Sequence, residues 1–249
     1  MITQCYDNTI SQTLRLNDDE VHVWYATLDR EAPHMGAFRQ TLSPGELARA
    51  DRFRLAEDRR RFIVGRGLLR LILSRYLGME PAQLRFCYGR YGKPALANGP
   101  GEDTLSFNLA HAEGLALYAV VRNRQIGVDV ERMRTDFDYQ EVAERFFSWR
   151  EQGVLRALPQ RARCEAFFAG WTRKEAYLKA RGEGLSFPLH EVEVTLAPGE
   201  PAALLSVGRD TGEARRWALH ELKPHPGYAA AVAVEGRGWR LGVGRWTDV

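Results

Sequence analysis

Three acidic residues in two short segments could together hold a divalent cation. Asp129 and Glu131 stand two residues apart in Ile126–Glu131 (IGVDVE), and Glu175 lies in Trp171–Lys179 (WTRKEAYLK). Side chains at i and i+2 of a strand point to one face, so Asp129 and Glu131 project together if their segment is a strand. Two such carboxylates repel each other unless a proton or a cation lies between them. A ligand set of oxygens alone favours Mg²⁺, Mn²⁺ or Ca²⁺ over zinc.

Each acid also has a plainer interpretation when it is taken alone. Acids at the end of a strand are commonly solvated, and a neighbouring arginine such as Arg132 could pair with Asp129 or Glu131. Glu175 and Lys179 are spaced i, i+4 in the favourable order, which is also the spacing of an ordinary helix ion pair worth about 0.3–0.5 kcal/mol. Taken singly, these residues therefore leave a metal site and a solvated surface both open.

Several basic side chains could contact phosphate. Lys93 follows a glycine in a predicted turn, where a solvated lysine is the plainer interpretation. His111 stands at the end of a predicted strand, and a structural role and a ligand-binding role are equally open to it. Nine arginines crowd residues 49–75, Arg49 and Arg61 among them. They form either the polar face of helices or a basic rim that binds phosphate or an acidic protein.

The composition limits the class of protein. The chain has 249 residues, 45% of them hydrophobic, enough for one large or two small domains. A net charge of only +3 does not favour binding to nucleic acid or to a membrane surface. The three cysteines are widely separated, which argues against a disulfide framework and a zinc site. A polar N-terminal segment and the absence of a long apolar run predict a soluble, cytoplasmic protein.

Helical and strand patterns alternate without a regular βαβ rhythm. Ser43, Pro44 and Glu46 form a helix-start signal. Further helices are predicted at 57–77, 139–147, 148–158 and 165–181, and strands at 21–28, 85–88, 105–109, 115–121, 126–130 and through most of 191–246. This order predicts an α+β fold with an N-terminal half, residues 1–122, and a C-terminal half, residues 123–249, that carries the metal site.

The separate motifs occur in a fixed order along most of the chain. They are the arginine-rich segment 57–70, Tyr91–Pro94 (YGKP), Phe107–His111 (FNLAH), Ile126–Glu131 (IGVDVE), Arg145–Ser148 (RFFS), Trp171–Lys179 (WTRKEAYLK) and Gly182–Ser186 (GEGLS). Together they resemble the 4′-phosphopantetheinyl transferases, specifically the large single-chain surfactin-synthetase type. The pairing of GxDxE with WxxKEAxxK at this separation is the most specific part of the resemblance.

The resemblance implies a definite reaction. Members of this family transfer the 4′-phosphopantetheine arm of coenzyme A to a serine of an apo acyl or peptidyl carrier protein and release 3′,5′-ADP. The resemblance implies two similar α+β halves, packed pseudo-symmetrically, with the active site at their interface. It implies Mg²⁺, with Mn²⁺ as an alternative, held by Asp129, Glu131 and Glu175. Glu175 would bind the metal, take the proton of the serine, or do both, and Lys179 would stabilise the transferring phosphate.

The resemblance also assigns the binding of coenzyme A, with one departure. Arg49, Arg61, Lys93 and His111 match positions that hold the adenylate and its 3′-phosphate. The family often has serine on either side of the histidine, whereas this chain has Ala110 and an alanine after it. A backbone N–H at Ala110 could still bind the 3′-phosphate. We therefore expect weaker recognition of the 3′-phosphate and not a loss of activity.

Partners and alternative functions follow from the same residues. An acidic carrier protein would dock on the basic rim, and residues 133–139 are a candidate for additional apolar contact. Fatty-acid, polyketide and nonribosomal-peptide carriers share the serine chemistry, so the pathway is open, and a two-halved chain is expected to be a monomer. Another Mg²⁺-dependent phosphoryl-transfer enzyme would fit the acids but not the order of motifs. A binding module without catalysis would rely on the arginines alone, and the low net charge counts against it.

Overall fold

The computed structural model describes residues 13–29, 32–97, 104–136, 138–182, 184, 187–210 and 212–247. In chain order the elements are β1 (Glu20–Thr27), α1 (Ala32–Thr41), α2 (Pro44–Ala50), α3 (Ala56–Leu77), η1 (Pro81–Gln83), β2 (Phe86–Tyr88), β3 (Pro94–Leu96), β4 (Leu105–Ala112), β5 (Leu115–Arg122), β6 (Ile126–Arg132), α4 (Tyr139–Phe146), α5 (Trp149–Ala157), α6 (Gln160–Arg181), η3 (Leu189–Glu191), β7 (Val192–Val194), β8 (Leu204–Val207), α7 (Glu213–Arg216), β9 (Trp217–Leu222), β10 (Tyr228–Glu235) and β11 (Arg240–Arg245). This is the mixed α+β class that the sequence predicts.

Two sheets form the centre of the molecule. One has the strand order β11-β1-β5-β4 and the other has the order β6-β10-β9, while β2–β3 and β7–β8 form two short ribbons. Strand β11 pairs in parallel with β1, so a strand from the end of the chain completes the sheet of the N-terminal half. The boundary at residue 122 stays a prediction.

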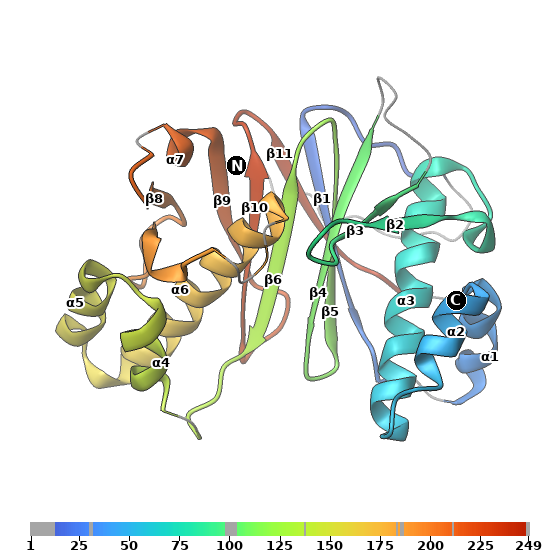
Figure 1. Cartoon of the computed structure of the whole chain (residues 1–249), viewed down its shortest axis with the longest axis horizontal. Helices are drawn as coiled ribbons and strands as arrows, with labels where there is room; N and C mark the ends of the chain where they lie inside the picture. Colours follow the sequence, from blue (N-terminus) through green and yellow to red (C-terminus); the bar gives the residue numbers. More distant parts are fainter. Residues whose placement is uncertain are drawn as a thin grey trace.

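The two sheets face each other, and helices cover their outer faces (Figure 1). Val23, Leu117, Val128 and Val232 belong to the core between the sheets. A second core lies between the first sheet and α3, and a third lies between the second sheet and α6. Each long helix therefore packs on one sheet, and the sheets pack on each other.

Both halves use the same order of elements. Each begins with a strand and continues through a 22-residue helix, α3 or α6, to a short ribbon and a pair of neighbouring antiparallel strands. In each half the last of these strands lies beside the first, β5 beside β1 and β10 beside β6. Both long helices end at a glycine in the left-handed region, Gly78 at φ 62° and Gly182 at φ 71°, where a side chain would be strained.

Local capping signals explain where α2 and α5 begin. Ser43 and Glu46 form the capping box at the start of α2, and Ser148 and Glu151 form a second one at the start of α5. Helix α6 begins at Gln160, directly after Pro159 and earlier than the predicted residue 165. Helix α1 was not predicted. In the part of the chain that the structure describes, no helix has the length and apolarity needed to cross a bilayer.

Candidate active site

Strand β6 presents the two predicted acids on the face that meets α6. Val128 and Val130 point to the other face and are buried in the core between the sheets. Asp129 is only 4% exposed, and Glu131 is half-buried. The alternation that the sequence predicts for this segment is confirmed.

Gly127 allows α6 to lie unusually close to β6. A Cβ atom at this position would stand 2.1 Å from the carbonyl oxygen of Ala176 and 2.3 Å from the backbone nitrogen of Ala180. Any side chain would therefore drive the helix away from the strand. The glycine two residues before Asp129 brings the helix that carries Glu175 within reach of the strand that carries Asp129.

Asp129, Glu175 and Lys179 meet between the strand and the helix. The Nζ atom of Lys179 donates to Oδ1 of Asp129 at 2.5 Å. The other oxygen of Asp129, Oδ2, and Oε1 of Glu175 are buried and have no hydrogen-bond partner. Carboxylate oxygens without a partner are costly in a protein interior, so these two atoms indicate a place for a proton or a cation.

The electrostatics of the three carboxylates give the same indication. Burial and the negative charge of Asp129 raise the pKa of Glu175 to about 7, and Lys179 opposes this shift. Burial raises the pKa of Asp129 despite its contact with Lys179. Burial and the charge of Asp129 also raise the pKa of Glu131. The three carboxylates are therefore close enough to disfavour one another's charged forms, and a bound cation would relieve this repulsion.

These side chains do not form a closed metal cage. Within the described ranges, no group of three His, Cys, Asp or Glu side chains is arranged to hold a metal ion. Mg²⁺ does not need such a cage, because it is usually held by one or two carboxylates together with waters and substrate phosphates. The partnerless oxygens of Asp129 and Glu175 and the all-oxygen donor set therefore fit Mg²⁺.

His111 of the N-terminal half lies near Lys179, which contacts Asp129. Partial desolvation lowers the pKa of His111, and the positive charges of Lys179 and Arg61 lower it further. His111 on β4 therefore lies near Lys179 of α6 and near Arg61 of α3. Arg61 pairs with Asp29 at 2.8 Å and with Glu57 at 2.6 Å, which fixes its position.

The other predicted coenzyme A residues, Lys93, Ala110 and Arg49, lie in three different environments. Lys93 donates to the carbonyl oxygens of Ile126 and Ala180, both in the C-terminal half. The side chain of Ala110 is buried in the core between the sheets. Arg49 is exposed, and its guanidinium lies 5.2 Å from the centre of the Phe62 ring. Arg49 therefore belongs to the outer surface of α2.

Residues that no sequence pattern singled out hold these groups in place. The buried side chain of Asn108 on β4 accepts a hydrogen bond from the backbone nitrogen of Val128 at 2.9 Å, which ties the two sheets together beside Asp129. Lys174 is fully buried and pairs with Glu151 at 2.6 Å. Both residues lie inside motifs that resemble the family, and the capping box signals Glu151 as well, but no local pattern says that these side chains are buried.

Two further features do not belong to this site. A hollow of about 910 Å³ is lined by Met133, Arg173 and Glu221 among others, and no predicted site residue lines it. Parts of two predicted segments, residue 137 in the 133–139 segment and residues 183, 185 and 186 in GEGLS, lie outside the described residues.

Comparison with known proteins supplies the family. The sequence model of the 4′-phosphopantetheinyl transferase superfamily matches residues 125–233, and that of the N-terminal region of 4′-phosphopantetheinyl transferases matches residues 31–122. The chain is 48% identical to the 4′-phosphopantetheinyl transferase HetI of Nostoc sp. over 91% of its length and 92% of that protein.

Two more distant relatives agree. The 4′-phosphopantetheinyl transferase Sfp of Bacillus subtilis is 31% identical over 64% of this chain and 68% of its own. The human L-aminoadipate-semialdehyde dehydrogenase-phosphopantetheinyl transferase is 26% identical over 78% of this chain and 67% of its own. The extent of the match to HetI and the two family matches, which together cover most of both halves, show that this chain belongs to the 4′-phosphopantetheinyl transferase superfamily.

Proposed function

We propose that this enzyme transfers the 4′-phosphopantetheine arm of coenzyme A to a serine of an apo acyl or peptidyl carrier protein, in a Mg²⁺-dependent reaction that releases 3′,5′-ADP. The observation that carries this proposal is the group formed by Asp129, Glu175 and Lys179. It lies in the two segments most typical of the family, and it holds two buried carboxylate oxygens without a partner.

Asp129 and Glu175 would hold the metal, with Glu131 as a third ligand or as a ligand through water. Bound there, Mg²⁺ supplies positive charge that offsets the charge of the pyrophosphate of coenzyme A. The partnerless oxygens and the raised pKa values of all three carboxylates support this assignment. Mn²⁺ prefers similar oxygen ligands and is a plausible replacement.

The side chains of the chain then have separate tasks in the transfer. The serine hydroxyl of the carrier attacks the β-phosphorus, a new phosphorus–oxygen bond forms, and the bond to the bridging oxygen breaks. Glu175 accepts the proton of the serine as a general base. Lys179 stabilises the negative charge that moves toward the leaving 3′,5′-ADP.

The N-terminal half would bind the nucleotide end of coenzyme A. His111 supports this role because it lies close enough to Lys179 and to Arg61 for their positive charges to lower its pKa. Lys93 and the backbone of Ala110 remain proposals for the phosphate contacts, and Arg49 is a proposal for the outer rim. An ammonium has three N–H donors, and Lys93 uses two of them on backbone carbonyls, so one N–H is left for a phosphate.

We further propose that the two halves are related pseudo-symmetrically, with the active site where they meet. The shared order of strand, 22-residue helix, ribbon and paired strands in both halves supports this relation. The nearness of His111 from one half to Lys179 from the other supports an interfacial site. The exposed arginines of α2 and α3 would receive an acidic carrier protein and increase its association rate.

Incubation of the enzyme with coenzyme A, Mg²⁺ and a panel of apo carrier proteins tests the proposal. We expect a carrier to gain the mass of one phosphopantetheine arm. Asp129→Asn should abolish this gain and weaken Mn²⁺ binding, because it removes a metal ligand but keeps the side-chain shape. Asp19→Asn, at a surface residue paired with Arg240, is the matched control and should leave both unchanged. Hydrolysis of coenzyme A without any gain in carrier mass would indicate a different phosphoryl-transfer enzyme.

A further inference from the structure

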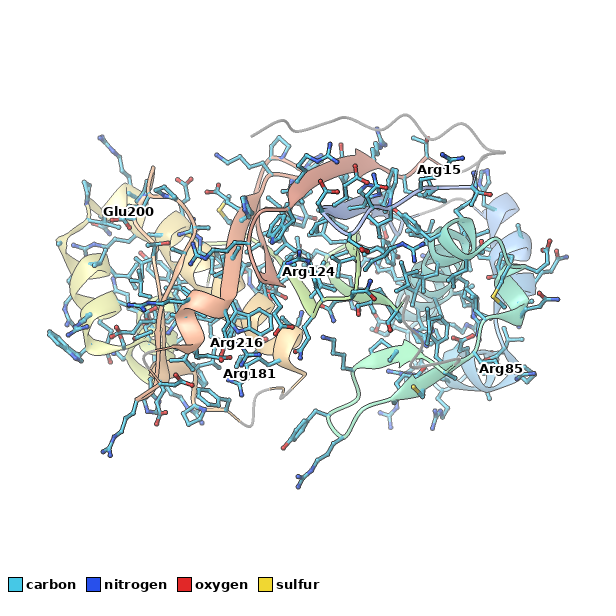
Figure 2. All side chains as sticks on the ribbon, turned by 90° about the horizontal axis from the view of Figure 1, so that it is seen from above. Arg15, Arg85, Arg124, Arg181, Glu200 and Arg216 are labelled. Carbon is cyan, nitrogen blue, oxygen red and sulfur yellow. The ribbon has the colours of Figure 1, made fainter. Side chains whose placement is uncertain are left out.

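The β2–β3 ribbon of the N-terminal half reaches across to the C-terminal half. Figure 2 shows the ribbon extending from the region of Arg85 toward the end of α6, where Arg181 is labelled. At its turn, Nζ of Lys93 donates to the carbonyl of Ile126 at 3.0 Å and to the carbonyl of Ala180 at 2.8 Å. One side chain therefore bridges both halves of the molecule through backbone atoms.

The two carbonyls that Lys93 binds belong to the end of α6 and to the start of β6. Ala180 lies in the last turn of α6, where carbonyls lack a partner within the helix. A cation at this end is also favoured by the helix dipole. Ile126 is the first residue of β6, directly before Gly127. Lys93 therefore fastens the end of the helix to the start of the strand at the place where the two approach most closely.

The turn of the ribbon is packed against the segment that follows α6. A Cβ atom at Gly182 would stand 3.4 Å from Cδ of Lys93, and one at Gly184 would stand 3.4 Å from Cβ of Tyr91. Both glycines have a positive φ, which a side chain would strain. The contact between the ribbon and the end of α6 thus includes packing as well as two hydrogen bonds.

A buried ionic network on α2 and α3 holds strand β2 of the ribbon in place. Arg66 on α3 pairs with the buried carboxylate of Glu46 and donates to the hydroxyl of Tyr88 at 2.5 Å. Its guanidinium also lies 4.4 Å from the centre of the Phe86 ring. Arg70 binds the second oxygen of Glu46 at 2.8 Å. The strand that leads to the Lys93 turn is therefore fixed to the helices of the N-terminal half.

We propose that Lys93 is a positioning residue that locks the end of α6 onto β6 and so holds Glu175 and Lys179 against Asp129. Arg66 and Tyr88 support this lock by anchoring the ribbon. The role belongs to the protein without ligand and is separate from any contact of Lys93 with coenzyme A. Its consequence for catalysis rests on the proposed function, whereas its consequence for the structure does not.

Hydrogen exchange of the full-length, ligand-free protein tests the lock directly. Lys93→Met keeps most of the side-chain volume and removes the donors. We expect amides near 178–182 and 126–128, and those of β2 and β3, to exchange about tenfold faster or more, because two charge-assisted hydrogen bonds are lost. Lys223→Met makes the same change at a lysine that is 81% exposed, and it should leave exchange at these sites unchanged.

A substitution in β2 provides a second, milder test of the proposal. Tyr88→Phe keeps the ring but removes the hydroxyl that accepts from Arg66, so we expect faster exchange in β2 and β3 with the rest of the protein unaffected. Unchanged exchange in Tyr88→Phe would contradict the anchoring of the ribbon by Arg66 and Tyr88. This measurement can be interpreted even if Lys93→Met does not fold.

Transfer kinetics then separate positioning from substrate binding. With coenzyme A saturating, Lys93→Met should lower kcat at least tenfold, because misplaced catalytic groups are not restored by more substrate. A raised KM with normal kcat and normal exchange would assign Lys93 to coenzyme A binding alone and overturn the proposal. If the wild type transfers nothing to any carrier while Lys93→Met still accelerates exchange, the proposed function fails and the lock stands.

Discussion

Substitution of Gly127 by alanine should damage catalysis by moving a helix, without touching any catalytic group. The added Cβ would stand 2.1 Å from the carbonyl oxygen of Ala176 and 2.3 Å from the nitrogen of Ala180, whereas real Cβ contacts under 3.0 Å are essentially unknown. Both opposing atoms are backbone, so no side-chain rotation can relieve the clash. The helix and the strand must therefore separate by about 1 Å.

The separation of α6 from β6 should lower both the transfer rate and the free energy of unfolding. Glu175 and Lys179 move with α6, while Asp129 stays on β6, so the 2.5 Å contact between Lys179 and Asp129 must stretch or break. A misplacement of about 1 Å can cost on the order of 10²-fold in rate. Overpacking of a well-packed core typically costs about 1–3 kcal/mol in the free energy of unfolding. We expect a folded but less stable enzyme with a transfer rate reduced about 100-fold.

Urea unfolding and carrier-protein mass measurements under saturating coenzyme A provide the assay. Gly153→Ala is the matched control, because Gly153 lies in α5 and a Cβ there meets nothing within 4 Å. That variant should be as active as the wild type and more stable by up to about 1 kcal/mol, since alanine favours helix over glycine. If Gly127→Ala folds and keeps a normal kcat, the close approach of α6 to β6 does not position the site and the reasoning is wrong.

Two further predictions concern stability. Lys174→Met should destabilise the protein by about 3–5 kcal/mol, because it leaves the buried Glu151 without its charged partner, and the double variant with Glu151→Gln should recover part of this loss in urea unfolding; normal stability of Lys174→Met would contradict this role of the pair. Burial lowers the pKa of His22 to about 4, so the unfolded chain takes up this proton near pH 6.5 while the folded protein does not. The free energy of unfolding should therefore fall by about 3 kcal/mol between pH 7 and pH 4 through His22, and His22→Asn should remove this part of the slope; an unchanged slope would contradict the assignment.

Local signals predicted much of the fold. The capping box at Ser43 satisfies backbone groups within four residues, so the sequence alone reveals it. The alternation around Asp129 likewise predicts which side chains share a face. Parallel pairing of β11 with β1 could not be predicted, because its partners lie about 220 residues apart and no local pattern records the pairing.

Burial of charged residues could not be predicted either. Lys174 and Glu175 are adjacent in the sequence, yet one is fully buried in a structural ion pair and the other lies beside Asp129. The difference depends on Glu151, whose placement is set by the packing of α5 on α6. The resemblance to a family supplied the site residues, while the structure supplies the reason that each has its place.

Three separate contacts restrain α6 as a rigid body, and each restrains a different movement. Successive residues of an α-helix are turned by about 100°, so the pairing of Lys174 with Glu151 sets the rotation that brings Glu175 toward β6. Gly127 sets the distance between helix and strand. Lys93 fixes the end of the helix through Ala180. Rotation, separation and axial position are independent, so none of the three contacts can replace another. Substitution of any one should therefore impair transfer even though every group that would bind the metal or move a proton remains in the chain.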